Sequence, residues 1–536
     1  MKKAIYLSKL CICLLLLASL TSCEDILEQY FPKPTPPPPA FPSLGLDIPF
    51  YTLSGGTKLD AYSTKDPAVR TSSVNITGLQ SGERILAIDF RPASGQLYGV
   101  SSSNRIYIIN HLTGRAHAVG SGAFTPGLEG NLVGFDFNPT VDRIRIVTST
   151  GQNLRLNPET GAGTIVDGTI NGAAGATITA SAYTNNVAGA STTVLYDLDP
   201  ATDKLYRQDP PNNGTLAAVG NLNLDITGEG GFDIDAKSGA ALGLFEVAGK
   251  ITLFTVNLTS GDSQPLAQYS QSLGYSGLAI PTQPVAYAIL ANFENTNPIK
   301  FNDLVIFNPT NPAARIIKPI TGLLTNEFIQ GIDFRPANGQ IYAITTNNRL
   351  ITLNAATAAA TFVGSLNVPL TRFFLGFDFN PVTDQIRITE AYTNTNLRIN
   401  PLKATVTVDG SYNQLFDSFR PFVVAAAYDN NFVGATSTNL YVISINANKL
   451  YLENPPNAGT LVEIGSLGVR NGRTDFDIGS TSNTGYAIMN ASGSSFTSGL
   501  YTISLSTGRA TFVSNIESFV PNSDKDISGF TMGLGF

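Results

Sequence analysis

The chain has 536 residues, 43% of them hydrophobic and only 14% charged, so it is long enough to bury an ample core without metals or disulfides. Its formal net charge is −7 and it contains no basic run, a balance that argues against nucleic-acid binding. It has two histidines and three cysteines, and two of those cysteines lie in the leader described next. So few histidines and cysteines exclude Ser–His, Cys–His and His-rich zinc sites.

The first 22 residues have the pattern of a secretory signal peptide. Lys2 and Lys3 give a basic start, residues 10–17 form an apolar core, and small residues precede Cys23. This ending resembles the lipobox of bacterial lipoproteins, whose cysteine is acylated and becomes the mature N-terminus. The apolar run is far shorter than the ~20 residues that span a bilayer. We therefore predict a signal peptide at 1–22, lipidation of Cys23, and no other membrane anchor.

A stalk is predicted at residues 23–43. Its prolines, in FPKPTPPPPAFPS at 31–43, favour extended polyproline II at ~3.1 Å per residue and lift the following domains off the membrane. Glu24 and Asp25 resemble a surface-display signal of Bacteroidota lipoproteins. The predicted location is therefore the outer membrane of a Gram-negative bacterium, facing the periplasm or the cell surface.

The rest of the chain is an internal duplication. The stretch 132–158 returns as 374–401, and two further blocks recur at the same separation of about 244 residues. These blocks are IDFRPASGQLYGV at 88–100 with IDFRPANGQIYAI at 332–344, and LYRQDPPNNGTLAAVG at 205–220 with LYLENPPNAGTLVEIG at 450–465. Because whole domains are copied, we predict a first repeat domain at 44–281 and a second at 282–536.

Within each copy a unit of about 45 residues recurs, in which an apolar run with Asp meets a turn and then a second apolar run. Pro, Asn, Asp and Gly supply the turns, while β-branched and aromatic residues fill the short flanking runs. Four short strands per unit, with no amphipathic helix, predict an all-β chain. Units of this length are typical of β-propeller blades.

One blade of each copy is predicted to be split. Residues 47–76 give only three strands, and Ser276–Ile280, at the far end of the copy, supplies the fourth. Residues 285–320 and Ser528–Met532 repeat this arrangement in the second copy. Such closure predicts two tandem five-bladed rings. The alternative, in which Ser276–Ile280 continues into the next strand, is one ten-bladed ring.

The most distinctive signature is GFDFNP, followed by Asp with Ile-Arg-Ile and then by NLR and Asn-Pro, at 134–158 and again at 376–401. It resembles a bacterial family of domains of unknown function, the one numbered 4394, which is commonly seen in tandem. The resemblance covers nearly all of 47–536 and implies a secreted repeat domain. It implies no catalytic residues.

Among basic residues, His111 and His117 are replaced by Ala355 and Thr361 at the aligned places of the second copy, which favours a surface role. Four arginines alternate with apolar residues in the signature and are predicted to pair with carboxylates or to cover blade edges, a site for an acidic ligand being the alternative. They are Arg145, Arg155, Arg387 and Arg398.

Six aspartates hold the same place in successive units: Asp89, Asp136 and Asp233 in the first copy, and Asp333, Asp378 and Asp477 in the second. If the strand that carries them is innermost, each set of three converges on a channel. The favoured interpretation is that each accepts hydrogen bonds from backbone N–H groups of its own turn or of the neighbouring blade. Two alternatives stay open, namely Ca²⁺ or Mg²⁺ held by these oxygens and glycosidase-type acid/base work by a close pair.

Taken together, these features predict a lipid-anchored cell-envelope β-propeller that binds or scaffolds, with a carbohydrate or an envelope protein as the ligand. No catalytic set stands out from the repeated frame, so neither an enzyme nor a cofactor is expected beyond the cation alternative. The alternatives are a glycan hydrolase that uses the channel carboxylates and a purely structural envelope protein. Pocket-lining residues that differ between the copies would favour specific binding over the structural alternative.

Overall fold

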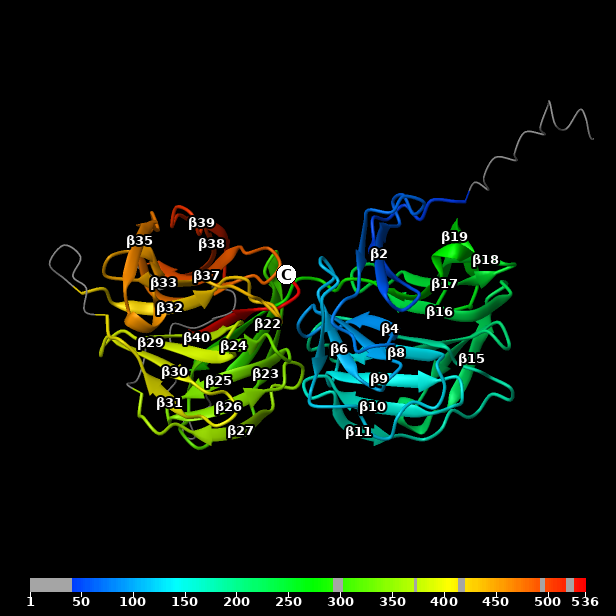
Figure 1. The fold of residues 1–536 in the computed structure, drawn as a ribbon, viewed down its shortest axis with the longest axis horizontal. Helices are drawn as coiled ribbons and strands as arrows, with labels where there is room; N and C mark the ends of the chain where they lie inside the picture. Colours follow the sequence, from blue (N-terminus) through cyan, green and yellow to red (C-terminus); the bar gives the residue numbers. More distant parts are fainter. Residues whose placement is uncertain (1–40, 293–301, 371–373, 413–419, 492–496, 517–524) are drawn as a thin grey trace, which may run out of the picture. The chain divides into compact units, whose positions relative to one another are not determined.

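Ten four-stranded antiparallel sheets, five from each copy, form the described part of the chain (Figure 1). The structure, a computed structural model, describes residues 41–292, 302–370, 374–412, 420–491, 497–516 and 525–536. The predicted signal peptide, Cys23 and most of the stalk lie outside these residues. The predicted all-β architecture of two five-bladed rings is confirmed.

In the first ring each blade runs from an innermost to an outermost strand. The blades are β20 (Tyr275–Ala279), β1 (Pro49–Ser54), β2 (Lys58–Ser63) and β3 (Ser72–Asn75); β4 (Ile85–Phe90), β5 (Leu97–Ser101), β6 (Ile106–Ile109) and β7 (Ala116–Val119); β8 (Val133–Asn138), β9 (Arg143–Thr148), β10 (Asn153–Asn157) and β11 (Ala162–Val166); β12 (Ala180–Tyr183), β13 (Leu195–Asp199), β14 (Lys204–Gln208) and β15 (Leu216–Asn221); and β16 (Ile226–Ile234), β17 (Ala241–Val247), β18 (Lys250–Val256) and β19 (Ser263–Tyr269).

The second ring repeats this order. Its blades are β40 (Lys525–Met532), β21 (Ala286–Asn292), β22 (Asp303–Asn308) and β23 (Asn311–Pro319); β24 (Ile329–Arg335), β25 (Gln340–Thr345), β26 (Arg349–Leu353) and β27 (Ala360–Ser365); β28 (Leu375–Asn380), β29 (Gln385–Glu390), β30 (Thr395–Ile399) and β31 (Val406–Val408); β32 (Val423–Tyr428), β33 (Leu440–Ser444), β34 (Lys449–Glu453) and β35 (Leu461–Ser466); and β36 (Asn471–Ile478), β37 (Gly485–Ala491), β38 (Thr497–Ile503) and β39 (Ala510–Asn515).

Helical structure among the described residues is limited to three short 3₁₀ turns, η1 (Pro211–Asn213), η2 (Gln271–Leu273) and η3 (Pro456–Ala458). No helix in this part of the chain is long and apolar enough to cross a bilayer.

Each ring is closed by the last strand of its copy. β20 pairs with β1, and β40 pairs with β21. The innermost strands contact one another in the cyclic order β4, β8, β12, β16, β20 and back to β4, and likewise β24, β28, β32, β36, β40 and back to β24. The ten-bladed alternative is therefore wrong, because the strand near residue 280 bonds to the start of its own copy. Closure also leaves no innermost strand without neighbours.

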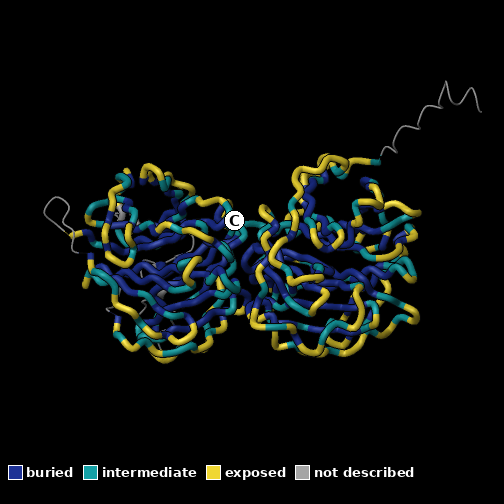
Figure 2. Tube along the Cα trace, viewed as in Figure 1, coloured by how far each residue is buried: buried dark blue, intermediate teal, exposed yellow. Residues whose placement is uncertain are grey.

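The core lies between neighbouring blades rather than in one central mass. All six residues of β4 are buried, whereas four of the five residues of the outermost strand β11 are exposed (Figure 2). Between the blades of β4 and β8, for example, Tyr98, Val100 and Ile106 pack with Phe135 and Ile144. Burial of apolar side chains on both faces of a blade explains why the inner strands read as nearly continuous apolar runs.

Candidate functional site

The six repeated aspartates lie on innermost strands and meet in two clusters. The first axial triad consists of Asp89 on β4, Asp136 on β8 and Asp233 on β16; the second axial triad consists of Asp333 on β24, Asp378 on β28 and Asp477 on β36. In each triad one oxygen from every carboxylate lies within 4.8 Å of the others, and the six residues are 1–2% exposed. The two remaining inner strands of each ring carry Ala182 and Ala279, or Ala427 and Thr531, at this level.

Every triad aspartate accepts a hydrogen bond from the backbone of the next inner strand. The Asp136 carboxylate accepts from Tyr183 N at 3.1 Å, and Asp233 accepts from Ile280 N at 2.6 Å. The other four contacts follow the same pattern: Phe137 N to Asp89, Phe379 N to Asp333, Tyr428 N to Asp378 and Met532 N to Asp477. The carboxylates thus join neighbouring blades, which is the role that turn chemistry favoured.

Burial dominates the electrostatics of both triads. Desolvation raises the pKa of Asp233 to about 7 and that of Asp477 to about 6, and it raises the pKa of Asp89 and Asp136 well above the usual range. The negative charges of Asp136 and Asp233 raise the pKa of Asp89 further. Three ionised carboxylates this close repel one another strongly, so each triad needs a proton or a cation to balance its charge.

One oxygen in each triad has no partner. Asp136 Oδ1 and Asp378 Oδ2 are buried without a hydrogen bond, although both side chains are only 1% exposed. The two aspartates occupy the same position in the two copies. A buried oxygen without a hydrogen bond destabilises the fold by about 1–3 kcal/mol, and by more when it carries charge. Its presence at the same position in both copies therefore calls for an explanation.

Space beside the second axial triad is very small. The cavity there measures about 10 Å³ and is lined by Gly331, Gly376, Asp475 and Gly529, each two residues before a residue of the axial level. Residues two apart on a strand face the same side, so this cavity continues the triad along the ring axis. It has room for about one water molecule, and a sugar ring does not fit.

The two histidines do not join these groups. His117 on β7 is exposed. His111 is half-buried, with its ring 5.3 Å from the ring of Tyr51 and 5.6 Å from that of Phe90, and burial lowers its pKa to about 4. His117 has the predicted surface position, whereas His111 packs as an aromatic residue.

The signature arginines form a structural network in which one arginine of each copy is buried and the other is partly exposed. Arg145 is 1% exposed; its Nη1 lies 2.6 Å from Asp167 Oδ2, and its Nη2 donates to Asn212 in the following blade at 2.7 Å. Arg155 binds the same Asp167 carboxylate with two donors. The second copy repeats these contacts with Arg387, Arg398, Asp409 and Asn457. The predicted pairing with carboxylates is confirmed.

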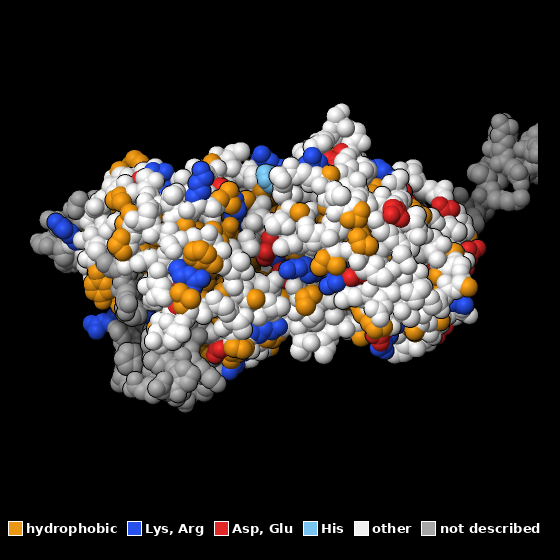
Figure 3. Space-filling model, turned by 90° about the horizontal axis from the view of Figure 1, so that it is seen from below, with side chains coloured by type: hydrophobic (Ala, Val, Ile, Leu, Met, Phe, Trp, Pro, Cys, Tyr) orange, Lys and Arg blue, Asp and Glu red, His pale blue; other side chains and the backbone are white. Residues whose placement is uncertain are grey.

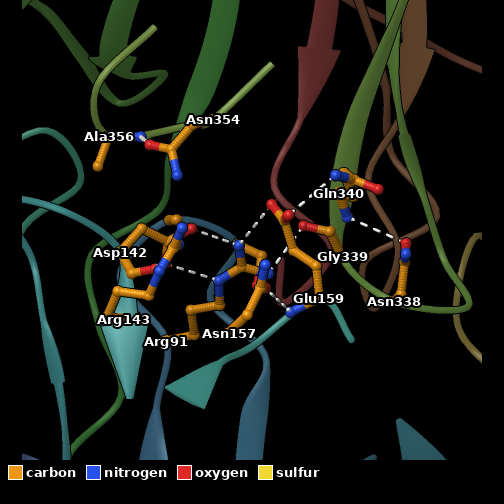
Figure 4. A network of polar contacts seen from close by, with 12 residues as sticks. Arg91, Asp142, Arg143, Asn157, Glu159, Asn338, Gly339, Gln340, Asn354 and Ala356 are labelled. Atoms are coloured by element: carbon orange, nitrogen blue, oxygen red, sulfur yellow. Dashed lines mark hydrogen bonds and ion pairs between the residues drawn. The ribbon is translucent and has the colours of Figure 1, made fainter. Parts of the chain in front are cut away.

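A second arginine network was not predicted (Figure 4). Arg91 is fully buried and binds both oxygens of Asp142, while its Nη1 donates to the Gly339 carbonyl at 2.8 Å. Glu159 lies 3.3 Å from Arg91 and accepts from Gln340 at 2.9 Å. Burial raises the pKa of Glu159 to about 7, although Arg91 acts in the opposite direction. This network links the first ring to residues of the second copy and is structural.

Sequence reasoning also missed an aromatic cluster, which consists of Phe374, Tyr392 and Phe422 where strands of the second ring begin or end. The Tyr392 ring lies 5.0 Å from that of Phe422 and 5.9 Å from that of Phe374. Tyr392 is 60% exposed, and the Arg473 guanidinium lies 5.9 Å from the centre of the Phe374 ring. The aligned residues of the first copy are Leu132, Thr150, Thr177 and Glu229. Comparison of the copies at loop positions was the available signal.

Comparisons with known proteins establish the family. No curated protein matches the sequence. Among solved structures, the chain is similar to the extracellular domain of a one-component system of B. thetaiotaomicron, at 10% identity and a TM-score of 0.25, over 87% of this chain and 70% of that chain. It is also similar to PorZ, a surface component of the type-IX secretion system of Porphyromonas gingivalis, at 13% identity and a TM-score of 0.25, over 87% of this chain and 58% of that chain. Both copies, at residues 58–279 and 303–530, match the family described as a domain of unknown function, DUF4394, and the chain therefore belongs to this family.

Proposed function

We propose that this chain is a lipid-anchored module of the cell envelope that binds a neutral carbohydrate at the aromatic cluster of its second ring. The observation that carries this proposal is the difference between the copies. The two rings share their frame, their triads and their arginine networks, yet only the second carries three clustered aromatic rings and an arginine at this place. Phe374 and Phe422 also pack against the core between their blades, but a purely structural role gives no reason for Tyr392, which is 60% exposed.

The chemistry of the cluster suits a sugar. Tyr392 offers a largely exposed ring, whose electron-rich face attracts the polarised C–H bonds on the apolar side of a pyranose. The Arg473 guanidinium lies over the Phe374 ring and brings a polar group to the edge of the cluster. Phe374 adopts a left-handed backbone with φ of 57°, which is rare for a bulky residue and costs about 1–3 kcal/mol. Strain of this kind gathers at binding sites, which supports the assignment.

One face of the molecule also suits a neutral ligand. On the face shown in Figure 3, uncharged polar side chains and backbone dominate, and charged side chains are scattered instead of gathered in one patch. A lipid on Cys23 and the proline-rich stalk would hold this surface away from the outer membrane, on its periplasmic or external side. Mass spectrometry that locates the lipid on Cys23 tests the anchor.

Binding is better supported than hydrolysis. The axial carboxylates are 1–2% exposed, and the cavity beside the second triad, about 10 Å³, admits a water and no sugar. A glycosidase needs its two carboxyl groups on opposite sides of a bound sugar, about 5–9.5 Å apart. The carbohydrate is therefore proposed as a ligand and not as a substrate.

The test is titration of the full-length mature protein with neutral oligosaccharides and purified envelope polysaccharides, followed by calorimetry. We expect Tyr392→Ala to weaken binding at least about tenfold, which is ~1.4 kcal/mol. Phe512→Ala is the matched control, because Phe512 is an aromatic residue of the same ring that is 58% exposed on an outer strand. Absence of binding to every neutral glycan, or unchanged binding by Tyr392→Ala, refutes the proposal.

A further inference from the structure

We propose that each ring holds one divalent cation, calcium by its ligand chemistry, between the three carboxylates of its axial triad. This site is separate from the aromatic cluster, so it stands or falls independently of carbohydrate binding. A cation would also account for the oxygen of each triad that hydrogen bonding leaves without a partner.

The ligand set of each triad suits calcium. Calcium prefers oxygen ligands at about 2.3–2.6 Å, and carboxylates are the usual source. In both triads one oxygen from each of three carboxylates lies within 4.8 Å of the others, close enough for all three to reach a common ion with small side-chain movements. Asp136 Oδ1 and Asp378 Oδ2 have no hydrogen-bond partner, and an ion at this point would coordinate them.

Hydrogen bonds already hold the carboxylates in place. Asp378 Oδ1 accepts from Tyr428 N at 2.9 Å and leaves Oδ2 for a ligand; Asp136 Oδ2 accepts from Tyr183 N at 3.1 Å and leaves Oδ1. Hydrogen bonds to the non-ligating oxygens orient carboxylates in metal sites. In Asp136 and Asp378 the contact between blades and the proposed cation thus use different oxygens. In the other four aspartates both oxygens accept backbone N–H groups, so the cation would use a further lone pair of an oxygen that already accepts a hydrogen bond.

The second ring offers more oxygen ligands for a cation than the first. Thr531 Oγ1 lies 2.8 Å from Asp333 Oδ1 and 3.0 Å from Asp477 Oδ2, yet a hydroxyl carries one proton and donates to only one of them. Further positive charge beside these oxygens resolves the conflict. The adjoining cavity has room for about one water molecule and is lined by Asp475. Because the first ring has Ala279 and Gly231 in place of Thr531 and Asp475, we expect the second ring to bind calcium more tightly.

The decisive experiment counts metal in the full-length mature protein after dialysis against buffer with micromolar calcium, by mass spectrometry of the elements. Two calcium ions per chain are expected, with Asp136→Asn and Asp378→Asn each removing one. Asparagine keeps an acceptor for the neighbouring N–H, so both variants should fold. Asp197→Asn is the matched control: Asp197 is fully buried and also has an orphaned oxygen, but it belongs to no triad, so two ions should remain.

Chelation gives a second measurement. Treatment with EDTA should lower the melting temperature of the native protein by at least about 5 °C, and calcium should restore it, because a ligand bound only to the folded state stabilises that state. The response should shrink in both triad variants. The proposal is overturned if the protein contains no calcium and if neither EDTA nor added calcium changes its melting temperature. Protons would then balance the charge of the triads. Occupancy by magnesium alone overturns the assignment to calcium.

Discussion

Asp197 shows what burial does to a single carboxylate in this fold. It lies on β13 with no exposed surface; Ser181 Oγ donates to its Oδ1 at 2.6 Å, and its Oδ2 has no partner. Desolvation raises the pKa of Asp197 to about 7, although Ser181 and the charge of Arg145 act the other way. The folded protein therefore holds a proton here at pH values where the unfolded chain has lost it.

The sign of the resulting pH dependence follows from this difference. Between the ordinary pKa of 3.8 and about 7 the folded state binds more protons than the unfolded state, so the contribution of Asp197 to stability is lost as the pH rises through this window. We expect Asp197→Asn, which stays neutral, to melt several degrees higher than native protein at pH 8, and this gain to vanish near pH 4. Melting curves at pH 4 to 8 measure it.

Asp199 is the control on the same strand. Both of its oxygens are used, since they accept from Thr177 N at 2.9 Å, Ala201 N at 2.8 Å and Thr202 Oγ1 at 2.6 Å. Asp199→Asn places an amide donor against one of these donors and should lower stability at every pH. A variant of Asp197 that melts below native protein at pH 8 contradicts the account of its burial.

At the residue scale the sequence identified most of the side chains that repeat, although it missed the pair Arg91 and Asp142, which returns as Arg335 and Asp384. The triad aspartates and Arg145 recur in equivalent units, and this repetition indicates a shared structural role. Asp197 and Glu159 have no such signal, because a single acidic residue within or just after a strand looks the same whether the fold buries it or not. Phe374 and Phe422 are also far apart in sequence, and only the ring brings their blades together.

At the scale of elements, the inner strands depend on small residues where they approach one another. A Cβ added to Gly231 on β16 would lie 2.1 Å from Leu278 N and 2.7 Å from Gly277 C, both in the backbone of β20. Backbone atoms of a neighbouring blade cannot move aside without opening the ring. Glycine is therefore required here by contact and not by a special backbone conformation.

Gly231→Ala should destabilise the first ring by about 1–3 kcal/mol or more, the usual cost of overpacking, with urea unfolding as the measurement. Gly122 is the control, because a Cβ there would meet no atom within 4 Å, and Gly122→Ala should change stability by less than about 0.5 kcal/mol. Equal midpoints for the two variants would show that the blades yield more easily than the contacts imply.

The elements themselves were largely predictable. Turn residues between short apolar runs marked the strands, and the copied Ser276–Ile280 and Ser528–Met532 correctly marked β20 and β40 as closing strands. The choice between two rings and one was not fixed by local pattern, since the same strand chemistry allows either closure. Pairing of β20 with β1 decides it, and that pairing joins residues more than 200 apart.

At the scale of the whole molecule, each ring contains its own closure but the rings also share contacts. Tyr287 Oη donates to the Ala93 carbonyl at 2.7 Å, and Arg91 donates to the Gly339 carbonyl. Ala93 and Leu534 belong to one apolar cluster. Loss of the second copy therefore removes partners from the first ring while leaving its five blades complete.

The first ring should accordingly fold by itself, with reduced stability. We expect the fragment 47–281 to be monomeric and to unfold in one cooperative transition, because β20 supplies its missing inner strand. The fragment 47–273 tests the cause: it lacks only Gly274, the closing strand and the two residues after that strand. β1 then keeps an open edge, and the core loses Tyr275, Leu278 and Ile280. That shorter fragment should aggregate or melt without cooperativity. Calorimetry and light scattering of both fragments decide the matter. A longer fragment that aggregates as readily as the shorter one would mean that the contacts with the second copy, and not closure by β20, hold the first ring together.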